Sequence, residues 1–294
     1  MKKLFYKLIL LFILIFPLKI KAYGITNYYI DINVLSNGDV NVKEIFSMDG
    51  SFNGMNRIIN FRGSTNKFDG SINSFKGSNI YNGDNIIINE IKGISYKNKL
   101  KYEDINLEGD IFKEVGGANK GEYGFYTKDL TYNGVNLLIY NPSSKNKAFY
   151  IDYTITNMGI VHNDIAELGF NLFTSMNEFI NNLEVYIHIP NNKNMLKVWA
   201  HGPLWGDTKI IDSNTVKLTI QNINANTPID CRLAFDKDTL NESNKKTYVD
   251  ALDKIIELET IQAEFANQER DEAKKIFENQ KKIELVYNIF KIIL

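Results

Sequence analysis

The sequence predicts a mainly β protein, an antiparallel β-sandwich with an N-terminal signal or anchor helix and a long C-terminal α-helix. Apolar and polar residues alternate over residues 149–156 and 183–190, which is typical of strands with one buried face. Turn dipeptides such as Asn37-Gly38 recur between short apolar runs, as expected of hairpins in a sandwich. Neither glycine nor proline occurs in residues 241–294, so nothing there interrupts a helix.

Composition excludes several classes of protein. The 294 residues are 44% hydrophobic, which is enough to build a core and excludes global disorder. The net charge is −1 and no basic cluster with interleaved aromatic residues occurs, so we expect no nucleic-acid partner. Cys231 is the single cysteine, so an intrachain disulfide is excluded.

Residues 1–22 have the pattern of an export signal. Lys2, Lys3 and Lys7 precede an apolar stretch at residues 8–18, and the small residue Ala22 ends a plausible cleavage site. The stretch is shorter than the roughly 20 residues of an ordinary membrane span. We therefore expect an extracytoplasmic protein whose leader is removed or stays as a membrane anchor. The alternative is a buried core helix.

We expect the β domain to occupy residues 23–239. The segment 25–34 and the segment from Val40 to Phe46 should form a hairpin about Asn37-Gly38. A second turn at Asn53-Gly54 precedes strand-like residues near Ile58. Residues 104–121 are polar enough to form a long surface loop. Further strands are expected at residues 86–88, 125–126, 137–140, 149–156, 183–190, 195–200, 215–220 and 229–235.

The last part of the chain, residues 240–294, is expected to form one long, charged helix. Apolar residues keep helical spacing near its start, but residues 267–275 are charged nearly all round, and a helix polar on every side cannot be buried. The helix should therefore project from the domain. Residues 283–294 become apolar again and leave three alternatives: a truncated transmembrane helix, an interfacial helix or a packing stripe.

Six short stretches follow one another along the chain at residues 29–42, 52–59, 163–170, 185–190, 198–202 and 232–235. Taken together and in this order, they resemble a bacterial family of predicted membrane proteins known as domain of unknown function 2207. The resemblance implies an extracytoplasmic β-rich domain after a signal peptide, then a membrane helix and a cytoplasmic tail. It favours the transmembrane alternative for residues 283–294 and implies no activity, ligand or catalytic residue.

The sequence contains no recognisable catalytic or metal-binding motif. With three histidines and no His-Glu-x-x-His or Cys-x-x-Cys spacing, we expect no metal and no cofactor. Paired carboxylates are the remaining catalytic alternative: Asp164 and Glu167 could serve as acid and base of a carbohydrate-active hydrolase, with Trp199 and Trp205 as a sugar platform. The ordinary alternative is that Asp164 caps a turn and Glu167 forms a surface ion pair.

Two loops are candidates for a binding surface, because tight turns on rigid β scaffolds often present Arg, His and Trp to partners. One contains Arg57, and the other contains His201 and Trp205. In the alternative, Arg57 pairs with Asp164 or Glu167, and the tryptophans belong to the core.

We therefore expect a non-enzymatic recognition or structural module of the cell envelope, associated with the membrane. Its partner would be an envelope protein or a glycan. The long helix would set the distance of the module from the bilayer or pair with a partner helix. An oligomerisation helix is a third possibility, although Glu259 and Gln262 at seam positions disfavour a strong coiled coil.

Overall fold

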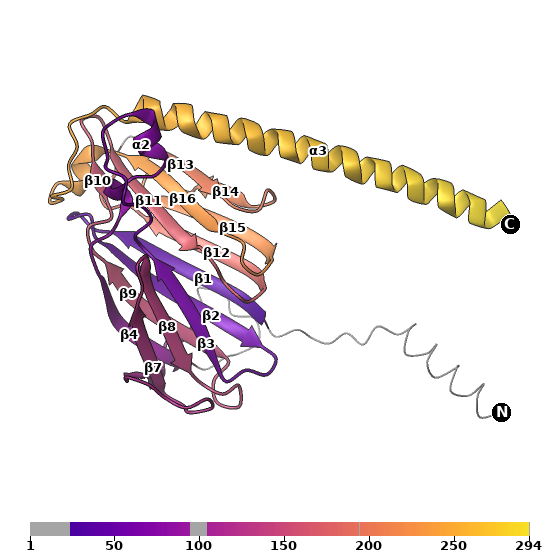
Figure 1. Cartoon of the computed structure of the whole chain (residues 1–294), viewed down its shortest axis with the longest axis horizontal. Coiled ribbons are helices and arrows are strands. Elements are labelled where there is room, and N and C mark those ends of the chain that lie inside the picture. The colour runs from indigo at the N-terminus through magenta and orange to yellow at the C-terminus, as the bar shows by residue number, and fades with distance from the viewer. Residues whose placement is uncertain (1–23, 95–104, 194, 294) are drawn as a thin grey trace.

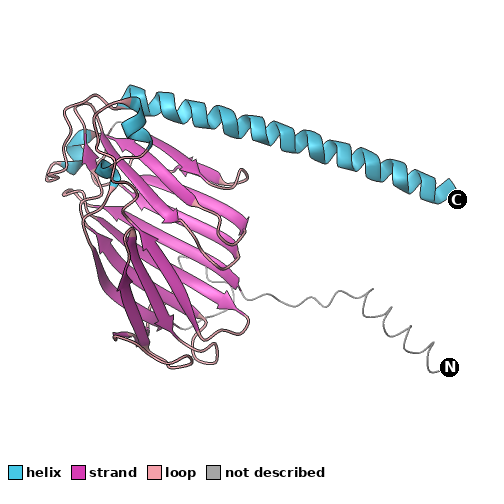
Figure 2. Cartoon of the chain, viewed as in Figure 1, coloured by secondary structure: helices cyan, strands magenta, loops and turns pink. Residues whose placement is uncertain are grey.

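The computed structural model describes residues 24–94, 105–193 and 195–293, and it confirms a mainly β domain with a long C-terminal helix (Figure 2). The strands are β1 Gly24–Val34, β2 Val40–Asp49, β3 Gly54–Asn60, β4 Ile86–Ile94, β5 Gly109–Ile111, β6 Lys113–Glu114, β7 Phe125–Leu130, β8 Gly134–Tyr140, β9 Ala148–Ile155, β10 Ile160–Val161, β11 Ala166–Phe173, β12 Ile180–His188, β13 Leu196–His201, β14 Asp207–Ile210, β15 Thr215–Ile223 and β16 Ile229–Phe235. The helices are α2 Ile72–Lys76, η1 Asn79–Tyr81, η3 Lys237–Leu240 and α3 Leu252–Ile293.

The strands form three sheets arranged in layers. The large sheet has eight strands in the order β14-β15-β12-β1-β2-β9-β4-β5. Two four-stranded sheets, β10-β11-β16-β13 and β3-β8-β7-β6, contribute to the same apolar core as the inner face of the large sheet. We call the β10-β11-β16-β13 sheet the middle sheet, because α2 and the start of α3 pack on its other face.

The hairpin of β1 and β2 forms as expected, with Val34 opposite Val40. Gly38 in the turn has a φ of 83°, a conformation that glycine adopts without strain. The purely antiparallel arrangement is wrong, because β1 runs parallel to β12, and β6 runs parallel to β7. The chain between β1 and β12 passes through strands of all three sheets before it returns, and such a long crossover permits parallel pairing.

Two segments contain elements that the sequence pattern did not predict. Residues 166–173, which carry the predicted carboxylate Glu167, form the strand β11. The expected surface loop at residues 104–121 is exposed over most of its described length, but it contains the short strands β5 and β6. These strands have three and two residues. Strands so short are not revealed by alternation of apolar and polar residues, which needs about four residues or more.

The long helix begins at Leu252, later than the expected residue 240. The backbone N–H groups of Ala251 and Leu252 each donate to a carboxylate oxygen of Asp164, at 2.9 Å in both cases. Residues before that point form an extended segment that lies along the middle sheet, where Lys246 forms a bridge with Val161. The Asp164 carboxylate satisfies N–H groups at the start of the helix, as a capping side chain does.

The first turns of α3 pack against the domain through apolar side chains. Ile255 and Leu258 are buried against Phe75, Ile165 and Ala234. The helix then projects past the sheets, on the side where β1 begins (Figure 1). The prediction of a projecting charged helix is confirmed.

The expected leader at residues 1–22 lies outside the described residues. Across residues 24–94, 105–193 and 195–293, no helix is both long enough and apolar enough to cross a membrane.

Candidate functional site

The polar face of β16 carries the charged residues nearest to α3. Cys231 and Leu233 point into the main core, and the alternate residues Asp230 and Arg232 point toward α2 and α3. This alternation follows from the period of two in a strand. A charged side chain buried between the middle sheet and the helices has lost its water, so it needs hydrogen-bond or ion-pair partners there.

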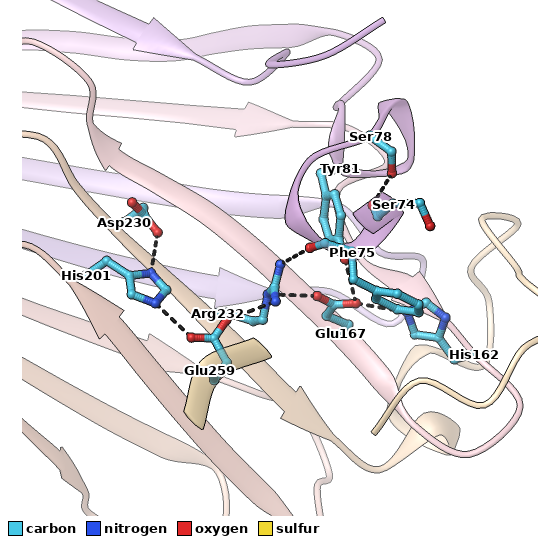
Figure 3. A network of polar contacts seen from close by, with 10 residues as sticks. All are labelled: Ser74, Phe75, Ser78, Tyr81, His162, Glu167, His201, Asp230, Arg232 and Glu259. Atoms are coloured by element: carbon cyan, nitrogen blue, oxygen red, sulfur yellow. Dashed lines mark hydrogen bonds and ion pairs between the residues drawn. The ribbon is translucent and has the colours of Figure 1, made fainter. Parts of the chain in front are cut away.

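Arg232 has partners on three different elements (Figure 3). Its Nη1 donates to Glu259 Oε1 of α3 at 2.9 Å, and its Nε lies 3.1 Å from Glu167 Oε1 of β11. Its Nη2 donates to the carbonyl oxygen of Phe75 at 2.5 Å. Burial opposes the positive charge, but the neighbouring carboxylates outweigh it and raise the pKa of Arg232.

His201, at the end of β13, bridges two carboxylates. Its Nδ1 lies 2.7 Å from Asp230 Oδ1, and its Nε2 lies 2.8 Å from Glu259 Oε2. These hydrogen bonds, to Asp230 and then to Glu259, raise the pKa of His201 to about 9. The ring is therefore an imidazolium at neutral pH and donates from both nitrogens.

The other end of this network reaches the extended segment before α3. His162 Nε2 lies 2.9 Å from Glu167 Oε2, and its Nδ1 lies 2.6 Å from the hydroxyl of Thr247. The hydroxyl of Tyr81 donates to the same carboxylate of Glu167 at 3.4 Å, and burial raises the pKa of that tyrosine. We call the connected set Asp230, His201, Glu259, Arg232, Glu167 and His162 the interlayer network.

Two cavities border the interlayer network. One, of about 440 Å³, lies between α3 and the edge of the large sheet and is lined by residues that include Trp199, Leu204, Ile220, Ala266 and Arg270. The other, of about 450 Å³, lies toward α2 and is lined by residues that include Lys76, Ser78, Tyr81, Asn171 and Asp230. His201, Glu259 and Gln262 line both cavities. The two cavities therefore adjoin at the hydrogen bond between His201 and Glu259.

The structure brings two of the five predicted site residues together in one network. Glu167 and His201 are joined through Arg232 and Glu259. Glu167 is fully buried, so the expected surface ion pair of this residue is wrong. Asp164 caps the start of α3, a role close to the expected turn cap. Asp164 is exposed and bonded to backbone N–H groups, whereas Glu167 is ion-paired inside the protein, so the two carboxylates of the hydrolase alternative do not lie together in one open cleft.

Arg57 and Trp205 lie apart from the interlayer network. Arg57 is buried in the main core, where its Nε and Nη2 donate to the two carboxylate oxygens of Glu44 at 2.8 and 2.6 Å. The expected pairing of Arg57 with Asp164 or Glu167 is therefore wrong. Trp205 is 61% exposed and its indole N–H donates to the carbonyl of Gln221 at 2.6 Å, so its assignment to the core is also wrong.

Sequence reasoning missed Arg232 and Glu259, the residues that connect the network. The sequence does contain a weak indication of the position of each residue. Arg232 occupies a polar position of an alternating strand, and Glu259 follows Ile255 by four residues, on the side of the helix that packs. Neither signal identifies a partner, because the partners are distant in sequence. Within the described part of the chain, no group of three or more His, Cys, Asp or Glu side chains is placed to hold a metal ion.

Comparison with known proteins adds one family. Residues 24–235 match the family described as "Predicted membrane protein (DUF2207) N-terminal domain". No curated protein matches the chain. Among solved structures, a putative protease from Parabacteroides distasonis is similar at 13% identity and a TM-score of 0.37, covering 73% of this chain and 40% of that one. An M1 zinc metallopeptidase from Deinococcus radiodurans is similar at 7% identity and a TM-score of 0.33, covering 72% of this chain and 42% of that one. The chain thus spans about two fifths of the length of these structures.

Proposed function

The chain belongs to the DUF2207 family of predicted membrane proteins, and from this premise we propose that it is a non-enzymatic structural or recognition module of the cell envelope. In this proposal, residues 24–239 form an extracytoplasmic domain, and α3 holds that domain at a set distance and orientation from the membrane. Its partner is an envelope protein or a glycan.

One observation carries the proposal: a buried carboxylate of α3, Glu259, is bonded to two different strands of the domain. Arg232 on β16 and His201 on β13 hold its two oxygens. Breaking a buried ion pair costs about 3–5 kcal/mol, which is a large part of the stability of a domain. A helix attached in this way is suited to fix the orientation of the domain that it carries.

The direction of α3 favours a membrane on the side of the domain where β1 begins. The helix projects past the sheets on the side where β1 begins, so Gly24, the first residue of β1, lies on the side toward which α3 points (Figure 1). Both apolar segments of the sequence, residues 8–18 and 283–294, are attached to these two ends. The 42 residues of α3 give a length of about 63 Å at 1.5 Å per residue.

The non-enzymatic part of the proposal is supported by the engagement of the predicted carboxylates. Asp164 fixes the start of α3, and Glu167 belongs to a buried ion-paired network. Retaining or inverting glycoside hydrolysis needs two carboxyl groups that face a substrate in an open cleft. The hydrolase alternative therefore has no geometric support.

Cell fractionation of a tagged full chain, followed by protease treatment of intact cells, tests the location. We expect the domain in the membrane fraction and degraded by external protease. Recovery of the intact domain in the cytosol, protected from protease, would contradict the proposal.

A further inference from the structure

The two oxygens of Glu259 are held by donors that do not belong to its own helix. Arg232 Nη1 donates to Oε1 at 2.9 Å, and His201 Nε2 donates to Oε2 at 2.8 Å. We propose that Arg232 and His201 form a binding site for a carboxylate, that Glu259 occupies this site within the chain, and that an external carboxylate ligand competes with Glu259 and releases α3.

Both donors are positioned by groups other than α3. Arg232 is held by Glu167 and by the carbonyl of Phe75, and His201 is held by Asp230. These contacts remain when α3 moves away. The site then keeps two N–H donors on adjacent strands, directed at the place of one carboxylate, as charge-assisted recognition of a carboxylate requires.

The donors left without an acceptor in the empty site also favour an anion. Without Glu259, the cations Arg232 and His201 face the carboxylates Glu167 and Asp230, and one N–H of each cation has lost its partner. A buried donor without an acceptor costs about 1–3 kcal/mol, more for a charged group. A carboxylate ligand removes that cost. Lys76 lines the α2 side of the site and adds a further positive charge.

A ligand can reach the site from two directions, because His201 and Glu259 line both cavities. The cavity toward α2 has polar walls that include Ser78 and Asn171, and the cavity under α3 has apolar walls that include Trp199 and Ile220. A small carboxylate with a polar substituent fits the first, and its carboxylate takes the place of the Glu259 side chain.

The described side chains of α3 just beyond Glu259 are mostly exposed. Ile261 and Phe265 are 44% and 63% exposed, and Arg270 donates one hydrogen bond to the Leu204 carbonyl at 3.1 Å and another to Asn267 of its own helix at 3.0 Å. The start of α3 is also held by apolar contacts and by the Asp164 cap, so loss of the Glu259 bonds releases the part of the helix that follows. This inference concerns the domain and α3 alone and goes beyond the proposed function, so a cytosolic location would not affect it.

The test uses acetate as the probe and the full chain as the protein. The temperature of half-unfolding is measured for wild type, Glu259→Ala and Glu257→Ala, in sodium acetate and in sodium chloride of equal ionic strength. Glu257 is exposed on the same helix and is the matched control. We expect acetate to raise the midpoint of E259A in a saturable way, because a ligand that binds only the folded state stabilises it. E257A should respond as wild type does, with a smaller rise that begins at a higher acetate concentration, because Glu259 competes with acetate.

A second measurement tests the proposal even if the E259A variant does not fold. Spin labels at Lys209→Cys on β14 and Glu264→Cys on α3 report the separation of helix and sheet in the E259Q variant and in wild type. Acetate should lengthen this distance, at a lower concentration in E259Q, because an amide is a weaker competitor than a carboxylate. Glucuronate and N-acetylalanine then represent a sugar acid and a peptide-like carboxylate. The probe that gives half of the distance change at the lower concentration identifies the class of ligand that the site prefers. An E259A midpoint that is equal in acetate and chloride, or a labelled distance that none of the three carboxylates changes, would overturn the proposal.

Discussion

Glu259 Oε1 on α3 lies 2.9 Å from Arg232 Nη1 on β16, and this ion pair joins the projecting helix to the middle sheet. Both side chains are largely shielded from water: those of Arg232 and Glu259 are 12% and 1% exposed. The pair is therefore poorly screened, and the loss of one partner leaves the other charge in a site of low polarity. The attachment of α3 depends on residues that lie 27 positions apart in the sequence.

Replacement of Glu259 by alanine should destabilise the folded protein by about 3–5 kcal/mol, because Arg232 and His201 both lose an acceptor. Denaturant unfolding of the full chain measures this change. The control Glu257→Ala removes an exposed carboxylate from the same helix and should change the free energy of unfolding by less than about 0.5 kcal/mol. Equal stabilities of E259A and E257A would show that the network does not hold α3.

Replacement of Asp164 by alanine should cost about 1 kcal/mol, within the range of lost helix caps, because the N–H groups of Ala251 and Leu252 lose their acceptor. Asp164→Asn keeps an oxygen acceptor and should recover part of the loss. Asp129→Ala, at an exposed strand position, is the control. The free energy of unfolding and the helical signal of α3 are the measurements. An Asp164→Ala variant as stable as the control would contradict the capping role.

The stability of the docked helix should fall at alkaline pH. The pKa of His201 is raised from 6.5 to about 9 by its hydrogen bonds to Asp230 and Glu259. A raised folded-state pKa means that the contribution is fully present below pH 6.5 and is lost as the pH rises through about 9. Unfolding free energies of wild type and His201→Gln, measured across this window, should converge toward its alkaline end. A difference that stays constant with pH would contradict the assignment.

The Arg57–Glu44 pair of the main core should behave as a unit. Burial favours the neutral acid, yet Arg57 outweighs it and holds the pKa of Glu44 below its usual value. Arg57→Met leaves a buried carboxylate with the hydroxyls of Tyr28 and Tyr153 and should cost about 3–5 kcal/mol. Arg57→Met combined with Glu44→Leu should recover much of that loss. A double variant whose loss equals the sum of the two single losses would show that the residues are not coupled.

The sequence pattern predicted the elements that have one buried face. The strand β9 alternates apolar and polar residues, and the Asn37-Gly38 turn marks the hairpin of β1 and β2, so both are visible locally. The strand β11 also alternates, because Ala166, Leu168, Phe170 and Leu172 face the main core and Glu167, Gly169 and Asn171 occupy the positions between them. The strand was not predicted, although the pattern was present in its sequence.

The site was harder to predict than the fold, because it is formed by contacts between residues that are far apart in the sequence. Glu167 was identified as one of two paired carboxylates, and His201 as part of a candidate binding loop. The partners that connect them, Arg232 and Glu259, come from β16 and α3. The start of α3 was misplaced for the same reason: helix propensity allows an earlier start, and the Asp164 carboxylate, 87 residues before Ala251, fixes the observed one.

The distance distribution between α3 and the large sheet tests most directly whether Glu259 fixes the helix to the domain. Spin labels at Lys209→Cys and Glu264→Cys report it, and Cys231 stays unlabelled because burial raises the pKa of its thiol and shields it. We expect one narrow distribution in the otherwise unaltered chain and a broad one after Glu259→Ala. A broad distribution before that substitution, or a narrow one that survives it, would contradict a helix held by the interlayer network.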